Sequence, residues 1–163
     1  MTRTLLDTGP LVAFLNRNDE WHTWARTQMG ALPPPLLTCE PVLTEACFLI
    51  QRNGGQPAEV LKKVQAGVLV VALEIDTEAA ALEALMRRYA DTPMSLADAC
   101  LVRLSELHAD CQVFTLDTDF RRYRRHGRQV IPLLAPNYDW SNGPAAVWPF
   151  IVSSWLFSLI QQL

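Results

Sequence analysis

The chain has 163 residues, half of them apolar, with 14 basic and 17 acidic side chains and a formal net charge of −3. This length suits one domain with a buried core and is too short for two ordinary domains. The acidic balance excludes a protein that binds nucleic acid over its whole surface, so any site for a polyanion must be a local basic patch.

The cysteines and the N-terminus indicate a reducing compartment. The four cysteines form no Cys-x-x-Cys pair, and three of them lie among apolar neighbours, which is typical of buried thiols. The first residues, "MTRTLLDTGPLVAF", lack the layout of a signal peptide, because the apolar run is short and Asp7 interrupts it. We therefore expect a cytoplasmic protein.

The first part of the chain alternates between short apolar runs and helical patterns. A buried strand is expected over 4–6 and ends at Asp7, after which Gly9 and Pro10 turn the chain into a short helix. The pattern then predicts a helix over 19–31, a strand over 36–38, and helices over 39–52 and 56–67.

The second part continues the alternation. We expect a strand over 68–73, helices over 77–90 and 95–109, a strand over 112–116, and a last strand over 129–134. The last strand should lie at an edge, because Pro132 cannot donate to a strand ladder. Alternating strands and helices predict an α/β fold, with a mainly parallel sheet between two layers of helices.

Two aspartates directly follow predicted strands. Asp7 follows the first strand, and Asp117 follows the strand over 112–116. Aspartate is a common turn residue, so either one alone has a simple structural explanation. In an open α/β sheet, however, ligands bind outside the carboxyl ends of the strands. Both carboxylates are expected at that same edge.

Two further acids lie on apolar faces of predicted helices. Glu45 is flanked at three and four residues by apolar side chains within "PVLTEACFLI", and Asp98 is flanked similarly in "SLADACLVRL". A buried carboxylate is costly unless it is paired or binds a metal. The alternatives are that Glu45 reaches water at the edge of its stripe, and that Asp98 forms a capping box with Ser95.

Four carboxylates in one pocket would repel each other unless a cation neutralised them. The three histidines show no metal-ligand spacing. Carboxylates without histidine or cysteine partners suit hard ions, so the sequence predicts Mg²⁺ or Mn²⁺ as the cofactor.

Four segments in order resemble the motifs of PIN-domain nucleases, most closely the VapC-type toxins of bacterial toxin–antitoxin pairs. They are "LLDTGPLVAFLNRND", "EPVLTEACFLI", "YADTPMSLADACLVRLSE" and "VFTLDTDFRRYRR", and the resemblance covers roughly residues 3–134. It implies a PIN-like three-layer α/β/α sandwich with a central, mainly parallel sheet of four to five strands. It also implies a metal-dependent endoribonuclease that acts on RNA, a cognate antitoxin protein and a homodimer.

The resemblance assigns roles to individual residues. The catalytic acids of the family fall on Asp7, Glu45, Asp98 and Asp117. The expected metal ligands are Asp7, Asp98 and Asp117, with Asp119 as a further acid, and Glu45 is expected to orient water or to help seat a second ion. Thr8 and Thr115 match positions where the family often keeps a hydroxyl group, and we expect them to orient the carboxylates.

The stretch "TLDTDFRRYRRHGR" adds basic side chains next to the last acids. We expect Arg121, Arg122, Arg124 and Arg125 to bind RNA phosphates, because guanidinium groups suit phosphate oxygens. The alternatives are a solvated arginine face, arginine–glutamate pairs with the helices, and contacts to an antitoxin.

Three other classes of protein fit the sequence less well. A haloacid-dehalogenase type of phosphatase also begins with a strand-end aspartate, but it needs a second acid where this chain has Gly9. A catalytically silent RNA- or protein-binding module would not need the complete acidic set. A plain regulatory α/β domain would not need Glu45 and Asp98 on apolar faces.

The C-terminal segment is not explained by the resemblance. We expect a nuclease domain over 1–136 and an apolar extension over 137–163, in which residues 140–163 carry no charge and three of the five tryptophans. That length would suffice for a membrane span, which needs about 20 apolar residues, but Pro149, Ser153 and Ser154 interrupt it. We expect it to pack on the domain or on a second subunit.

Overall fold

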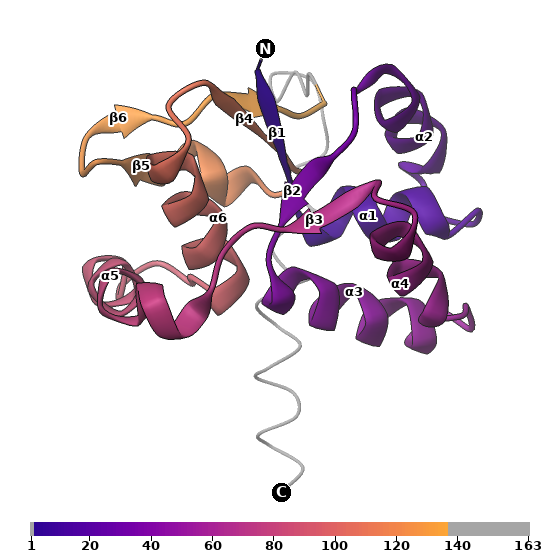
Figure 1. The fold of residues 1–163 in the computed structure, drawn as a ribbon, viewed down its shortest axis with the longest axis horizontal. Coiled ribbons are helices and arrows are strands. Elements are labelled where there is room, and N and C mark those ends of the chain that lie inside the picture. Colours follow the sequence, from indigo (N-terminus) through magenta and orange to yellow (C-terminus); the bar gives the residue numbers. More distant parts are fainter. Residues whose placement is uncertain (1, 137–163) are drawn as a thin grey trace, which may run out of the picture.

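A five-stranded parallel sheet forms the centre of the protein (Figure 1). The structure is a computed structural model, and it describes residues 2–136. The strands are β1 (Arg3–Leu6), β2 (Leu36–Thr38), β3 (Leu69–Val71), β4 (Cys111–Phe114) and β7 (Leu133–Leu134). They lie in the order β3-β2-β1-β4-β7, and every neighbouring pair is parallel. The predicted parallel sheet of four to five strands is confirmed.

Helices cover both faces of this sheet (Figure 1). One side carries α1 (Thr8–Leu15), α2 (His22–Ala31), α3 (Glu40–Arg52) and α4 (Ala58–Gln65). The other side carries α5 (Ile75–Arg88) and α6 (Leu96–Leu107). This three-layer α/β/α arrangement is the predicted fold class.

The two central strands are apolar on both faces because helices cover both. Leu5 of β1 and Val113 of β4 belong to the core cluster that contains most of α6. The next residue of each strand, Leu6 and Phe114, belongs to the cluster under α1 and α3. All four side chains are fully buried, as expected for a parallel sheet between two helical layers.

The C-terminal part of the sheet differs from the prediction of one edge strand over 129–134. The chain first forms an antiparallel hairpin of β5 (Arg124–Arg125) and β6 (Gln129–Val130), and only then joins the sheet as β7. Pro132 separates β6 from β7. It has no N–H to donate, but its carbonyl oxygen accepts from the backbone of Val113 at 2.8 Å.

Within residues 2–136, no helix is long and apolar enough to cross a membrane. The expected extension over 137–163 lies outside the described residues. The domain boundary at 136, and the packing of the extension on the domain or on a second subunit, therefore remain predictions.

Candidate active site

The two strand-end aspartates leave the sheet at the same edge. Asp7 follows β1 directly and caps the N-terminus of α1. Asp117 lies just beyond β4 and caps the short 3-10 helix η1 (Thr118–Arg121). Because β1 and β4 are neighbours with Leu6 opposite Phe114, both carboxylates start from adjacent strand ends, as the sequence predicted.

The hydroxyl group of Thr115 joins these two strand ends. It donates to Oδ2 of Asp7 at 2.6 Å and accepts from the backbone N–H of Asp117 at 2.8 Å. Gly9 leaves room for the chain beside Leu116, because a Cβ atom at position 9 would lie 3.2 Å from Cβ of Leu116, which is a tight contact. Thr115 thus links the carboxylate of Asp7 to the backbone of Asp117.

A second hydroxyl group brings the acid of α3 into the same network. Thr8 donates from its side chain to Oε2 of Glu45 at 3.0 Å, while its backbone N–H donates to Oδ1 of Asp7 at 2.7 Å. Glu45 is therefore hydrogen-bonded towards the strand ends, although it is 37 residues away in the sequence. The alternative of a glutamate that only reaches water does not describe this contact.

Asp98 forms the capping box that the sequence analysis gave as an alternative, and it is buried as well. It forms the capping box of α6, in which its Oδ2 accepts from the backbone of Ser95 at 2.9 Å and its own N–H donates to the Ser95 hydroxyl group at 3.1 Å. It is also buried, with 8 % of its surface exposed. The hydroxyl group of Tyr123 approaches the same Oδ2 at 3.5 Å, a contact that the sequence analysis missed.

Burial and mutual repulsion make these carboxylates hard to ionise. Burial, followed by the charge of Asp98, raises the pKa of Asp7 to about 8. Burial, with added repulsion from Asp117 and Glu45, raises the pKa of Asp98 to about 7. Burial also raises the pKa values of Glu45 and Asp117. The four acids predicted from the sequence therefore form one electrostatically coupled group.

The donor set fits a hard divalent cation. Within residues 2–136, none of the four acids forms an ion pair with a basic side chain. In Glu45, Asp98 and Asp117, one carboxylate oxygen accepts a hydrogen bond from the protein, and the other has no hydrogen-bond partner among the described residues. Such oxygens suit Mg²⁺ or Mn²⁺.

The carboxylates are not closed around one point. The described part of the chain contains no group of three His, Cys, Asp or Glu side chains already gathered as metal ligands. An ion at this edge would therefore be held by some of the carboxylates and by water, and Mg²⁺ commonly keeps several waters in protein sites.

Comparison with known proteins agrees with this geometry. Residues 4–126 match the PIN domain family. The protein belongs to the PIN-domain family. Its fold is similar to that of VapC20 from Mycobacterium tuberculosis, described as a toxin that cleaves the sarcin–ricin loop, with a TM-score of 0.66 and 23% sequence identity over 79% of this chain and 99% of that chain. None of the curated proteins compared with the chain matches it.

Asp119 lies at the edge of the acidic group of this PIN domain. Its backbone N–H donates to Oδ1 of Asp117 at 2.8 Å, so its first contribution is to hold that carboxylate. Its own Oδ1 lies 3.6 Å from Nη1 of Arg122. Because a cation of the protein already shares this carboxylate, Asp119 is less suited than Asp117 to bind a metal directly.

The arginines that follow η1 are not equivalent. Arg121 and Arg122 are exposed. Arg124 instead turns back on its own chain, where Nη1 donates to the carbonyl oxygens of Arg121, Arg122 and Tyr123 at 2.6 to 3.1 Å. Arg121 and Arg122 therefore lie at the surface, with Arg122 close to Asp119, and Arg124 has a structural role.

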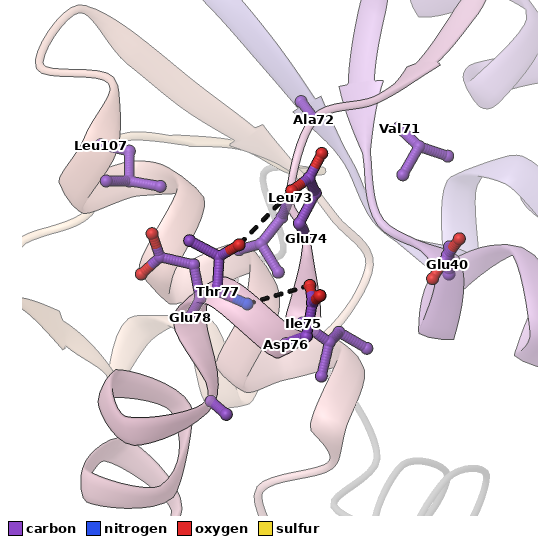
Figure 2. A pocket seen from close by; sticks show the side chains of 11 residues that line it. Glu40, Val71, Ala72, Leu73, Glu74, Ile75, Asp76, Thr77, Glu78 and Leu107 are labelled. Carbon is purple, nitrogen blue, oxygen red and sulfur yellow. Dashed lines mark hydrogen bonds between the residues drawn. The ribbon is translucent and has the colours of Figure 1, made fainter.

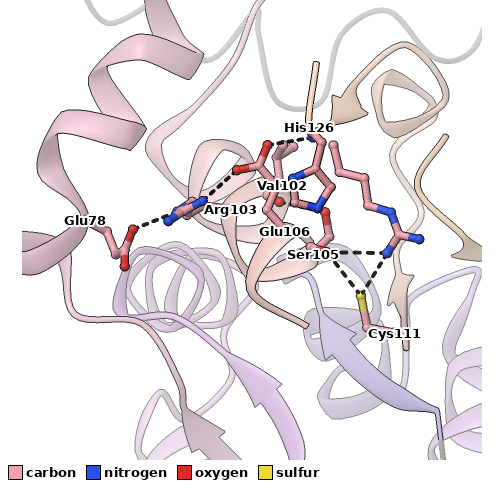
Figure 3. Close-up of polar contacts among 8 residues, drawn as sticks. Glu78, Val102, Arg103, Ser105, Glu106, Cys111 and His126 are labelled. Atoms are coloured by element: carbon pink, nitrogen blue, oxygen red, sulfur yellow. Dashed lines mark hydrogen bonds and ion pairs between the residues drawn. The ribbon is translucent and has the colours of Figure 1, made fainter. Parts of the chain in front are cut away.

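Arg125 is bound to the end of α6. Its Nη1 donates to the carbonyl oxygen of Ser105 at 3.4 Å and to a second carbonyl oxygen after the helix at 3.0 Å. Figure 3 shows the polar network beside it, in which Arg103 bridges Glu78 of α5 and Glu106 of α6. These contacts attach the β5–β6 hairpin and α5 to α6, away from the acidic group.

A hollow of about 930 Å³ lies where β3 leads into α5 (Figure 2). None of the four acids of the candidate site lines it. Its lining combines apolar side chains with four carboxylates, those of Glu40, Glu74, Asp76 and Glu78. These charges would repel RNA phosphates, so we assign this hollow no part in binding RNA.

Proposed function

We propose that this PIN domain is a metal-dependent endoribonuclease, and that it acts as the toxin of a toxin–antitoxin pair. The observation that carries the proposal is the coupled group of four acids, Asp7 and Asp98 buried and Glu45 and Asp117 half-buried, with no basic partner in the described residues. Membership of the PIN-domain family and the fold shared with the toxin VapC20 support it.

We assign metal binding to three of the acids and the orientation of their carboxylates to two threonines. Asp7, Asp98 and Asp117 would hold one Mg²⁺ or Mn²⁺ ion, while Thr8 and Thr115 keep the carboxylates oriented. A bound divalent cation supplies positive charge that stabilises the phosphate in the transition state and makes water a stronger acid. The backbone N–H of Asp119 holds the carboxylate of Asp117 in place.

Glu45 is the acid to which we assign the proton transfer. Thr8 holds its Oε2, which leaves Oε1 to accept a proton from the attacking water. Burial raises the pKa of Glu45, which makes it a stronger base than an exposed glutamate. Arg121 and Arg122 would bind the phosphates that flank the cleaved bond.

The test is RNA cleavage by the purified protein in Mg²⁺ or Mn²⁺ and in EDTA, with total RNA and a sarcin–ricin stem-loop as substrates. We expect cleavage that needs the metal and is lost in Asp7→Asn and Asp98→Asn. Asp91→Asn is the matched control, because Asp91 is exposed. Cleavage that survives both site substitutions would refute the assignment. RNA binding without cleavage by the native protein would favour a catalytically silent module.

The partners follow from the same proposal. A toxin of this type requires a cognate antitoxin protein, and we propose that the chain forms a homodimer and acts in the cytoplasm. Light scattering of the purified protein measures the number of chains. Co-expression with the protein encoded next to it tests the antitoxin, which should relieve growth arrest and remain bound during purification.

A further inference from the structure

Tyr123 lies in the arginine-rich stretch, and its side chain reaches the acidic group. It is fully buried, whereas Arg121 and Arg122 before it are exposed. Its hydroxyl group lies 2.7 Å from the carbonyl oxygen of Pro93 and 3.5 Å from Oδ2 of Asp98. It therefore reaches the segment that leads into α6 and the carboxylate at the start of that helix.

The ring of Tyr123 is held by other aromatic side chains. It makes edge-to-face contacts with Tyr89 and Phe120, with ring centroids 5.1 and 5.4 Å apart. The hydroxyl group of Tyr89 accepts from the backbone N–H of Arg124 at 2.9 Å, which fixes the chain just after Tyr123. A ring packed on two sides cannot rotate freely, so its hydroxyl group has a defined position.

The hydroxyl group acts as a donor in this position. A tyrosine hydroxyl group is protonated near neutral pH and can therefore donate a hydrogen bond. Its single proton is donated to Pro93 at 2.7 Å, and the approach to Asp98 at 3.5 Å is longer than an ordinary O–H···O hydrogen bond. A small shift of the Asp98 carboxylate on binding an ion would tighten this second contact.

Oδ2 of Asp98 therefore accepts from one backbone donor and lies near the hydroxyl group of Tyr123. The backbone N–H of Ser95 donates to it at 2.9 Å, and the Tyr123 hydroxyl group lies behind it. Oδ1 has no hydrogen-bond partner among residues 2–136. Donors on one oxygen fix the rotation of the carboxylate and leave the other oxygen for an external ligand.

We propose that Tyr123 is a positioning residue for the cation site, because its buried hydroxyl group fixes one oxygen of Asp98 and leaves the other to bind the ion. This inference rests on the proposed metal-dependent function. Substitution of a group that orients a metal ligand typically lowers metal affinity or activity by about 10- to 100-fold. Because the contact is long, we expect a loss near tenfold.

The experiment measures Mn²⁺ binding without RNA, by the electron paramagnetic resonance signal of the free ion. Tyr123→Phe removes only the hydroxyl group and should weaken Mn²⁺ binding about tenfold. Tyr89→Phe removes the same group from the neighbouring ring, which holds the backbone of Arg124 and touches no acid of the site, and should lower the affinity less than Tyr123→Phe does. In the Asp98→Asn background, Tyr123→Phe should have no further effect.

The outcomes separate this inference from the proposed function. Equal Mn²⁺ affinity in the native protein and Tyr123→Phe, or equal losses in Tyr123→Phe and Tyr89→Phe, would overturn the role of Tyr123 and leave the nuclease intact. A native protein that binds no Mn²⁺ would overturn both. In cleavage assays, Tyr123→Phe should need about tenfold more Mn²⁺ for half-maximal activity, with the KM for RNA unchanged at saturating metal.

A second measurement applies if Tyr123→Phe does not fold. The chain has only three tyrosines, so native protein labelled with 3-fluorotyrosine should give a simple fluorine NMR spectrum. The Tyr123 signal is identified by elimination with Tyr89→Phe and Tyr138→Phe. It should shift as Mg²⁺ is added to the native protein and remain fixed in Asp98→Asn. A Tyr123 signal whose chemical shift does not change when Mg²⁺ is added to the native protein would overturn the proposal.

Discussion

Replacing Asp7 with asparagine should stabilise the metal-free protein while it abolishes cleavage. Asp7 is 6 % exposed and lies beside Asp98 and Asp117. Asparagine keeps an oxygen for the backbone N–H of Thr8 and offers an N–H to the hydroxyl group of Thr115. It removes the charge that burial and repulsion disfavour.

The pKa of Asp7 sets the size and the sign of the effect. Its pKa is about 8 in the folded protein, against an ordinary value of 3.8 for the unfolded chain. Between these values the folded state holds a proton that the unfolded chain has lost, so a rise in pH destabilises the native protein by up to about 1.4 kcal/mol per pH unit. At pH 7 the accumulated penalty is at most about 4 kcal/mol, and relaxation of the site reduces it.

Thermal unfolding in EDTA from pH 5 to pH 8 measures this difference. Asp7→Asn should unfold at a higher temperature than the native protein at pH 7, by roughly 3 °C or more if the penalty is about 1 kcal/mol or larger. The gap should widen as the pH rises. Mg²⁺ should then stabilise the native protein and have a smaller effect on the variant, which narrows the gap.

Asp91→Asn is the control for the change of aspartate to asparagine itself, because Asp91 is exposed. It should shift the unfolding temperature little at any pH. An Asp7→Asn variant that is less stable than the native protein at pH 8, or a gap that is the same at pH 5 and pH 8, would refute the argument that Asp7 is a buried, strained carboxylate.

Three further variants test the surroundings of the site. Thr115→Val removes the group that joins Asp7 to Asp117, and it should weaken Mn²⁺ binding by about 10- to 100-fold in a direct titration. Replacing Arg121 and Arg122 together with alanine should lower the slope of log affinity for single-stranded RNA against log salt by about 0.7 per lost phosphate contact. Arg125→Ala should leave that slope unchanged and instead destabilise the fold by about 1 to 3 kcal/mol in urea unfolding, because the guanidinium group binds carbonyl oxygens at the end of α6.

The central sheet could be predicted from the sequence because its signals are local. Apolar runs such as 4–6 and 112–116 are followed by an aspartate, and the helices between them carry clear apolar stripes. The hairpin of β5 and β6 was missed because its turn, at His126 and Gly127, lies inside a charged stretch with no apolar alternation. The contacts between this hairpin and α6 join residues that are distant in the sequence, so no local pattern predicts them.

The parts of the site that follow from local sequence could be predicted, and those that depend on distant contacts could not. The strand-end positions of Asp7 and Asp117 follow from local sequence, and their convergence follows from the parallel order of β1 and β4. The sequence does not distinguish the arginines from one another. Arg125 nevertheless donates to carbonyl oxygens that lie near it only because the hairpin packs on α6. Tyr123 was missed for the same reason, since Asp98 is 25 residues away.

Three of the four acids serve at the start of a helix. Asp7 caps α1, Asp117 caps η1, and Asp98 belongs to the capping box of α6. In Asp98 and Asp117, the capping hydrogen bond uses one oxygen and leaves the other without a partner among the described residues. A cap and a metal ligand are therefore not competing explanations, because they require different oxygens. The backbone donors at these helix ends also favour negative charge, so the fold itself offsets part of the repulsion that the carboxylates would otherwise suffer in the absence of a cation.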